Sequence, residues 1–166
     1  AMMKKNLQKN NGYTLLFAVL VSSIVLSIGI SILTISKKEF LLSASARDST
    51  SAFYAADSAL ECAAYQDAQG VFATSSTPGP FQCAGATITR AGGLTDTDYY
   101  TFTFQMPLGT SGSCSVVTVE KYFDADNIFT TKILAKGYNI GWLGEEDGGC
   151  VDASSRRVER ALQLIY

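Results

Sequence analysis

Histidine is absent from the 166 residues of this sequence. Histidine is the commonest general base near neutral pH and the commonest zinc ligand. Without an imidazole, no serine or cysteine has the usual partner that activates a nucleophile. The four cysteines also lack a CxxC or other zinc-like spacing. We therefore predict a protein that is not an enzyme and that has no catalytic residues, no metal and no cofactor.

A strong excess of either charge is also missing. Thirteen Lys and Arg stand against 15 Asp and Glu, which gives a net charge of -2. Without a strongly basic balance, the sequence gives no indication of a nucleic-acid partner. Charge is wholly absent from residues 13–35, which read YTLLFAVLVSSIVLSIGISILTI. At a rise of ~1.5 Å per residue, a helix of this length crosses a hydrocarbon core of about 30 Å.

Three explanations of residues 13–35 compete. The hydrophobic region of a cleaved secretory signal is shorter and ends in an A-x-A-like site, which ILTISKK does not offer. A buried core helix is possible, but such a long run without charge is rare in soluble proteins. A retained single membrane span explains the segment best. The lysines that flank it give a mild preference for a cytoplasmic amino terminus; they are Lys4, Lys5 and Lys9 before the span, and Lys37 and Lys38 after it.

Residues 36–69 continue the helical pattern without a glycine or proline and are rich in alanine. The simplest prediction is one helix over residues 13–69, transmembrane or filament core over 13–35 and amphipathic over 36–69. Residues at alternating steps of four and three make a stripe on one helical face. We expect this stripe to lie under a sheet; its members are Leu42, Ala46, Ser49, Phe53, Ala56, Leu60 and Ala63.

From Gly70 onward the pattern changes to a period of two. A turn-rich αβ-loop at residues 74–80 is followed by segments rich in Val, Ile, Thr, Tyr and Phe. Residues 70–166 are thus predicted to form a globular β-sheet domain, and the whole chain an α+β fold. The expected strands are 81–90, 99–105, 115–123, 128–138 and 156–166. The last segment suits a strand or a helix, and a strand is favoured because an antiparallel meander needs a final member.

All four cysteines follow the apolar segment, and an even number beyond a membrane indicates two disulfides in an oxidising compartment. Four buried free thiols are the alternative. Three pairings are possible. We favour Cys62–Cys83, which ties the helix to the first strand, and Cys114–Cys150, which joins positions at one end of the sheet. One difficulty is that Cys62 lies nearly opposite Phe53 on a helical wheel.

The opening of the chain resembles the class III signal of type IV pilins. In that family a basic leader ends in a glycine, and Phe-Thr-Leu-Ile-Glu follows. Here Gly12 matches the glycine, and Tyr13 to Leu16 match the next four residues. The stretch SAFYAADSALECA at 51–63 is similar to the helix of PilX-type minor pilins. The motif resemblance covers roughly residues 4–65, and beyond these only the architecture agrees.

This resemblance implies that prepilin peptidase removes residues 1–12 by cutting between Gly12 and Tyr13. Tyr13 would then be the first residue of the mature subunit and would carry N-methylation. Pilins wait in the cytoplasmic membrane and assemble with other pilin subunits through the helix into an extracellular filament. The implied partners are thus other pilin subunits, the peptidase and the inner membrane before assembly. The implied function is that of a pilus subunit without catalysis.

One position departs from the family pattern. Pilins place a glutamate at mature position five, where this chain has Phe17. A carboxylate in hydrocarbon is costly unless it finds a partner, so Phe17 removes both the cost and the pairing. Tip pseudopilins lack the glutamate too, which favours a minor, tip or initiating subunit. Two alternatives stay open: a pseudopilin of a secretion or DNA-uptake system, and a membrane-anchored receptor that binds through aromatic residues such as Tyr99, Tyr100 and Trp142.

Overall fold

The computed structural model describes residues 11–74, 79–96, 98–109, 112–144, 149–151, 154 and 156–166. These belong to two compact units, one that ends at Ala44 and one that extends from Ser45 to Tyr166. The predicted leader, residues 1–12, lies outside the described residues except for the backbone of Asn11 and Gly12.

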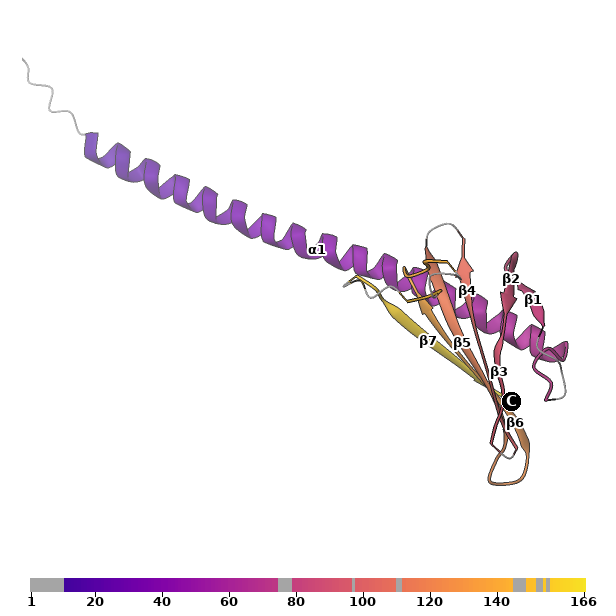
Figure 1. The fold of residues 1–166 in the computed structure, drawn as a ribbon. Coiled ribbons are helices and arrows are strands. Elements are labelled where there is room, and N and C mark those ends of the chain that lie inside the picture. Colours follow the sequence, from indigo (N-terminus) through magenta and orange to yellow (C-terminus); the bar gives the residue numbers. More distant parts are fainter. Residues whose placement is uncertain are drawn as a thin grey trace, which may run out of the picture. The chain divides into compact units, whose positions relative to one another are not determined.

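One continuous helix, α1 (Asn11–Ala68), contributes to both units (Figure 1). It begins two residues before the predicted start and ends one residue before the predicted end. Its apolar half contains hydroxyls that satisfy themselves within the helix. Ser31 donates to the carbonyl of Ser27 over 2.9 Å, and Ser22 donates to that of Val19 over 3.0 Å. No side-chain donor in these pairs therefore needs water.

The helix ends in a glycine-centred cap. Gly70 has a φ of 78°, a left-handed conformation that costs glycine little. The amide of Gly70 donates to the carbonyl of Asp67, and the amide of Val71 donates to that of Gln66 over 3.0 Å. These are the two hydrogen bonds of a Schellman motif. The cap turns the chain back toward the core, where the ring of Phe72 is fully buried.

The remainder of the second unit is antiparallel sheet. β1 (Pro80–Cys83) and β2 (Ala86–Thr89) form a two-stranded sheet. The larger sheet is a five-stranded meander in the order β3-β4-β5-β6-β7, and every pair in it is antiparallel. Its strands are β3 (Ala91–Asp96), β4 (Tyr99–Leu108), β5 (Ser113–Phe123), β6 (Phe129–Tyr138) and β7 (Glu159–Ile165). The α+β prediction is confirmed, and the last segment is a strand.

The sequence prediction was wrong at the first strand. Residues 81–90 do not form one strand, because Ala84 and Gly85 adopt φ values of 49° and 80° and reverse the chain between β1 and β2. Two successive residues with positive φ are the signature of a tight hairpin turn. The glycine-rich β3 was not predicted at all. Its two glycines lowered the apparent strand propensity of an edge strand that pairs along β4.

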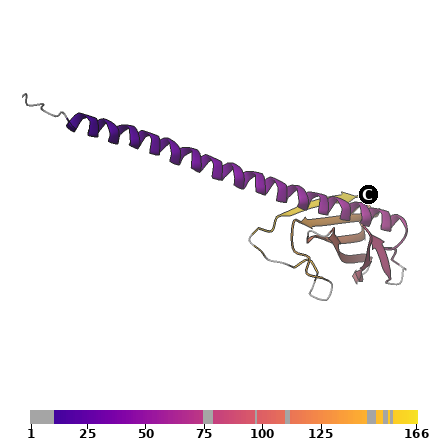
Figure 2. The ribbon, with the colours of Figure 1, turned by 90° about the horizontal axis from the view of Figure 1, so that it is seen from above.

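The helix packs on the larger sheet through a face of alanines that overlaps the predicted stripe only in part. The buried face of α1 consists of Ala52, Ala55, Ala56, Ala59 and Ala63. Opposite it lies Gly137 on β6, where an added Cβ would come within 3.0 Å of helix backbone atoms. The elements are too close for larger side chains, so alanine alone fits. Figure 2 shows the carboxy-terminal half of α1 over the sheet, with β7 beside it.

The predicted stripe is therefore partly wrong. Ala56 and Ala63 are buried, and Leu60 is half-buried. Phe53 is 43 % exposed, Leu42 is 70 % exposed, and Ala46 is also exposed. The centre of the buried face is turned away from Phe53, toward the side of the helix on which Cys62 lies. This rotation also removes the difficulty that a Cys62 bridge posed.

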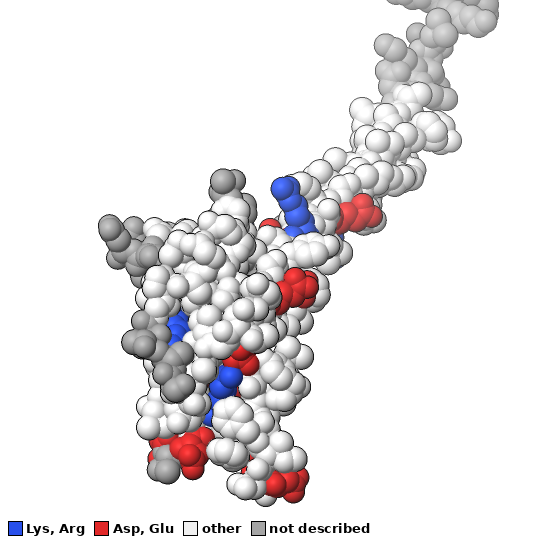
Figure 3. Space-filling model, turned by 90° about the vertical axis from the view of Figure 1, so that its right-hand side faces the viewer, with Lys and Arg blue, Asp and Glu red and all other residues white. Residues whose placement is uncertain are grey.

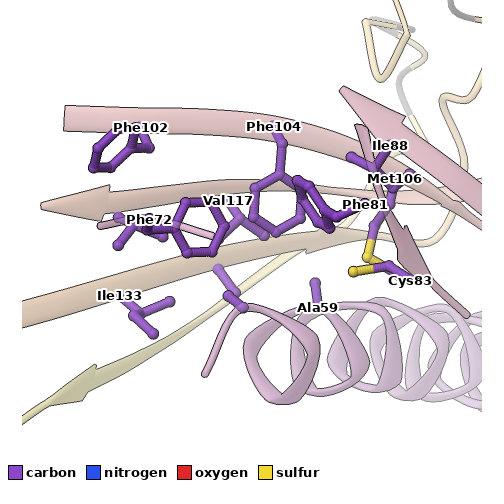
Figure 4. Close-up of a cluster of buried hydrophobic side chains, with 13 residues drawn as sticks. Ala59, Phe72, Phe81, Cys83, Ile88, Phe102, Phe104, Met106, Val117 and Ile133 are labelled. Carbon is purple, nitrogen blue, oxygen red and sulfur yellow. The ribbon is translucent and has the colours of Figure 1, made fainter. Parts of the chain in front are cut away.

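A cluster of rings fills the space between α1, the small sheet and β4. Phe72 is at its centre and stacks on Phe104 with ring centroids 5.9 Å apart. Phe81 meets Phe104 edge to face at 5.1 Å. Ile133, Val117 and Met106 close the cluster from the sheet (Figure 4). Edge-to-face and stacked pairs are the favourable arrangements for rings at these distances. The core thus lies where the larger sheet, the small sheet and the helix meet.

Candidate functional site

The amino-terminal half of α1 is the most conspicuous exposed surface of the chain. Every described side chain from Tyr13 to Arg47 is exposed. This helix is the one described element that is long and apolar enough to cross a membrane. Exposed leucines, isoleucines and valines on all sides are stable in lipid or against other helices, but not in water. The chain therefore has a helix suited to single-pass membrane anchoring.

The predicted site residues fall into two groups. Gly12, Tyr13 and Phe17 all lie on the first unit, where Tyr13 and Phe17 are exposed on the apolar helix. Phe17 thus presents an aromatic ring, not a charge, at the helix surface. The cysteines lie in the second unit and serve its stability rather than a shared site.

Two disulfides link the cysteines in the pairing that the sequence favoured. Cys62 on α1 is joined to Cys83 on β1, with the α-carbons 5.9 Å apart. Cys114 on β5 is joined to Cys150 in the segment between β6 and β7, with the α-carbons 5.8 Å apart. The first bridge fixes the small sheet to the helix. The second fixes the long β6–β7 connection to the sheet. All four cysteines are therefore in disulfides.

An ion pair and side-chain hydrogen bonds connect β5 and β7 to α1. The ammonium of Lys121 on β5 forms a buried ion pair with Asp67. The hydroxyl of Tyr166 donates to the other carboxylate oxygen of Asp67 over 2.8 Å. Burial and the neighbouring carboxylate raise the pKa of Tyr166. At the other end of β7, Nε of Arg160 donates to the hydroxyl of Ser49 over 2.9 Å, and Ser49 lies one helical turn after the start of the second unit. Both ends of β7 are thus tied to α1.

The opposite face of the sheet carries polar side chains that pair with one another across neighbouring strands. Lys132 lies 2.9 Å from Glu120 on the neighbouring strand, and this contact lowers the pKa of Glu120. Tyr138 donates to Glu159 over 2.8 Å, and burial together with this bond raises the pKa of Tyr138. Cross-strand pairs of this kind satisfy the polar groups of a partly buried surface. Sequence reasoning did not single them out, because they depend on strand register.

The long β6–β7 connection is also organised by side chains. Asn139 accepts from the amide of Val158 over 2.7 Å and donates to the carbonyl of Arg156 over 3.1 Å. Arg157 places its guanidinium 3.7 Å from the ring centroid of Tyr138 and donates to the carbonyl of Cys150. Asn139 was not predicted to be important, although an asparagine directly after a strand is typical of such bonds.

A groove of about 550 Å³ lies beside this connection. Trp142 and Gly149 form one wall of it, and Gln105 lies on the sheet side with its carbonyl bonded to the amide of Cys150 over 2.6 Å. The groove is bordered further by Thr89, Ala91, Thr103 and Val116. Of the aromatic residues proposed for a receptor, Trp142 lines this groove. Tyr99 instead stacks on Tyr122 at 5.9 Å.

Among the residues that the structure describes, no three His, Cys, Asp or Glu side chains gather in a way suited to a metal ion. Comparison with protein-family models, with curated proteins and with solved structures finds no match to this chain.

Proposed function

We propose that this chain is a structural subunit of a type IV pilus or a related filament. The observation that carries the proposal is an exposed apolar helix that continues without a break into the second unit. Disulfides stabilise this unit, which we call the head. Hydrophobic surface on every side of a helix suits two environments in turn: a bilayer, and a bundle of sister helices. The motif at residues 9–16, KNNGYTLL, supports processing between Gly12 and Tyr13.

Phe17 favours a minor, tip or initiating subunit within that proposal. An aromatic ring gives neither the cost of a carboxylate in lipid nor the pairing that a carboxylate would offer to a neighbour's amino terminus. A pseudopilin of a secretion or DNA-uptake system would have the same processing and helix. The two are distinguished by the machinery with which the subunit copurifies.

Intact-mass measurement tests the processing step. The full chain is produced in membranes with and without a prepilin peptidase, and the expected result is loss of residues 1–12 and a methylated Tyr13 only when the peptidase is present. Gly12→Val should block the cut, because it places a branched side chain directly before the expected cleavage site. Gly29→Val is the matched control, because an added Cβ at Gly29 meets nothing within 4 Å. A leader that remains in all samples contradicts the proposal.

The groove beside Trp142 favours a second candidate, a membrane-anchored binding domain that never enters a filament. Mechanical shearing of cells separates the two candidates. A filament subunit is released with sheared filaments, whereas an anchored receptor stays with the membrane fraction.

A further inference from the structure

Three exposed apolar side chains gather at the tip of the β5–β6 hairpin. Phe123 and Phe129 face each other in register and meet edge to face, with ring centroids 5.2 Å apart. Together with Ile128 they form what we call the apical patch; the exposed fractions are 48 % for Phe123, 61 % for Ile128 and 44 % for Phe129. Exposed apolar side chains that gather in this way are typical of an interaction surface.

The rim of the apical patch is acidic. Asp126 is exposed and Asp124 is half-buried in the same turn, and Asp124 accepts the amides of Asp126 and Ile128 at 3.0 and 2.9 Å. The exposed Asp98 lies at the same end of the sheet, because the next residue, Tyr99, pairs with Tyr122. Acidic groups are visible at the lower end of the second unit in Figure 3.

The lysines closest in the sheet do not neutralise this rim. Lys121 is committed to Asp67 beneath the sheet, and Lys132 is committed to Glu120 on the opposite face. The apical patch is thus an apolar tip with carboxylates around it. A partner that fits it must offer apolar side chains together with positive charge.

The first unit has a surface of that complementary kind. Ser36, Lys37, Phe40 and Leu41 line a shallow groove of about 390 Å³, which we call the stalk groove. Lys37, Phe40 and Leu41 share one helical face because they are three and four residues apart. Phe40 and Leu41 are 75 % and 67 % exposed. Glu39, two residues from Lys37, points to the opposite side of the helix.

The hydrocarbon core of a bilayer does not cover the stalk groove. Residues 13–35 already span about 35 Å at ~1.5 Å per residue, more than a hydrocarbon core of about 30 Å. Phe40 and Leu41 follow the charged residues Lys37, Lys38 and Glu39 and therefore lie beyond that core. A protein surface that offers apolar side chains can cover them.

We propose that the apical patch of one copy docks in the stalk groove of a second copy. Phe123, Ile128 and Phe129 would cover Phe40 and Leu41, while Asp98 and Asp126 would face Lys37. The identity of the partner rests on the filament function proposed above. Because the two surfaces differ, the contact is heterologous and links copies head to tail without closing into a dimer. It thus adds an axial contact to packing between the apolar helices.

Photo-crosslinking of the full chain, produced together with a prepilin peptidase and then solubilised in detergent, tests this contact, because copies anchored in one bilayer hold residues 36–41 at the same height. Benzoylphenylalanine is placed at position 129, and ¹⁵N-labelled and unlabelled chains are mixed so that cross-links between copies are recognised by mass. The expected product joins residue 129 of one copy to residues 36–41 of another. Lys37→Glu or Asp126→Lys should each reduce its yield about fivefold, the factor that the loss of one interfacial ion pair gives. The two changes together should restore it.

Glu61→Lys is the matched control, because Glu61 is exposed on α1 and belongs to neither surface. Asp124 is left unchanged, since its carboxylate holds the turn. Cross-links within one molecule, to the apical patch of another copy, to lipid or to a different protein would each overturn the proposal. So would a yield that charge reversal does not change.

The two proposals fail in different ways. Leader removal is measured by intact mass in the same samples. A cross-linked chain that keeps residues 1–12 supports the head-to-tail contact and contradicts the filament function. A processed chain that is released with sheared filaments but gives no cross-link to residues 36–41 contradicts the contact and leaves the filament function supported.

Discussion

Gly137 on β6 lies directly against the helix backbone at Ala56, and no side chain separates the two elements. A Cβ at position 137 would come within 3.0 Å of backbone atoms of Ala52, Ala55 and Ala56. The backbone of a helix cannot yield locally as the end of a flexible side chain can. The close approach therefore makes position 137 a tight constraint on how the second half of α1 packs on the sheet.

Gly137→Ala should destabilise the second unit by about 3 kcal/mol, because the helix must move away from the sheet and lose its alanine contacts. Gly93→Ala is the control, since nothing lies within 4 Å of a Cβ there. Its expected effect is within about 0.5 kcal/mol. Urea unfolding followed by the fluorescence of Trp142, the one tryptophan of the chain, measures both. Equal effects would contradict the close contact.

Ala59→Leu should cost about 2 kcal/mol or more through overpacking, because Ala59 is fully buried between helix and sheet. Phe53→Leu places the same residue type on the same helix at an exposed position and should change stability by less than about 0.5 kcal/mol. Thermal unfolding of both variants compares the two faces. If Phe53→Leu were the more harmful change, the stripe predicted from sequence would be the true packing face.

Lys121→Met should destabilise the fold by about 3 kcal/mol, because it leaves the carboxylate of Asp67 buried without a cation. Adding Asp67→Asn removes the uncompensated charge and should recover part of the loss. Urea unfolding of the single and double variants gives the difference. A double variant no more stable than Lys121→Met would show that the buried charge is not the cause.

The Glu120–Lys132 pair should make stability depend on pH. The hydrogen bond from Lys132 is the main cause of the lowered pKa of Glu120, and the hydroxyl of Tyr99 adds to it. A carboxyl group with a lower pKa in the folded state stabilises the fold above its unfolded pKa. That contribution is lost as the pH falls through the folded pKa.

Wild type should therefore exceed Glu120→Gln in melting temperature near pH 7. The difference should shrink as the pH falls below the unfolded pKa of about 4.3, and it should vanish only below the lower pKa of the folded state. Glu61→Gln controls for the general loss of a carboxyl group from an exposed position. A difference between wild type and Glu120→Gln that stays constant from pH 7 to pH 3 would contradict a role for ionised Glu120.

Local patterns in the sequence predicted the elements better than their contacts. The long helix was predicted because charge, glycine and proline are scarce in it. Residues 115–123 and 128–138 were predicted to be separate strands, and Asp124 and Asn127 between them are typical turn residues. In the structure, Asn127 adopts a φ of 61° and Asp124 accepts the amides of the turn. These signals are local, so they do not depend on the tertiary fold.

The packing face was not predicted, because it is decided by the distance between helix and sheet. The predicted stripe included the large side chains of Phe53 and Leu42, although a close approach selects the smallest residues. The sequence signal for this packing face was a set of regularly spaced alanines in α1 together with a glycine, Gly137, inside a predicted strand. Likewise, the turn at Ala84 and Gly85 was overlooked because the segment on either side reads as one continuous strand.

The two disulfides also determine how the head responds to a pull along the chain. They join residues 21 and 36 positions apart, so tension passes directly through the sulfurs from Cys62 to Cys83 and from Cys114 to Cys150. The segments enclosed by these bridges, which include β6 and most of β5, cannot be drawn out by force. Of the head, only the backbone outside the two rings can lengthen. The β5–β6 hairpin would thus keep its covalent closure under a mechanical load that unravels β2, β3 and β4.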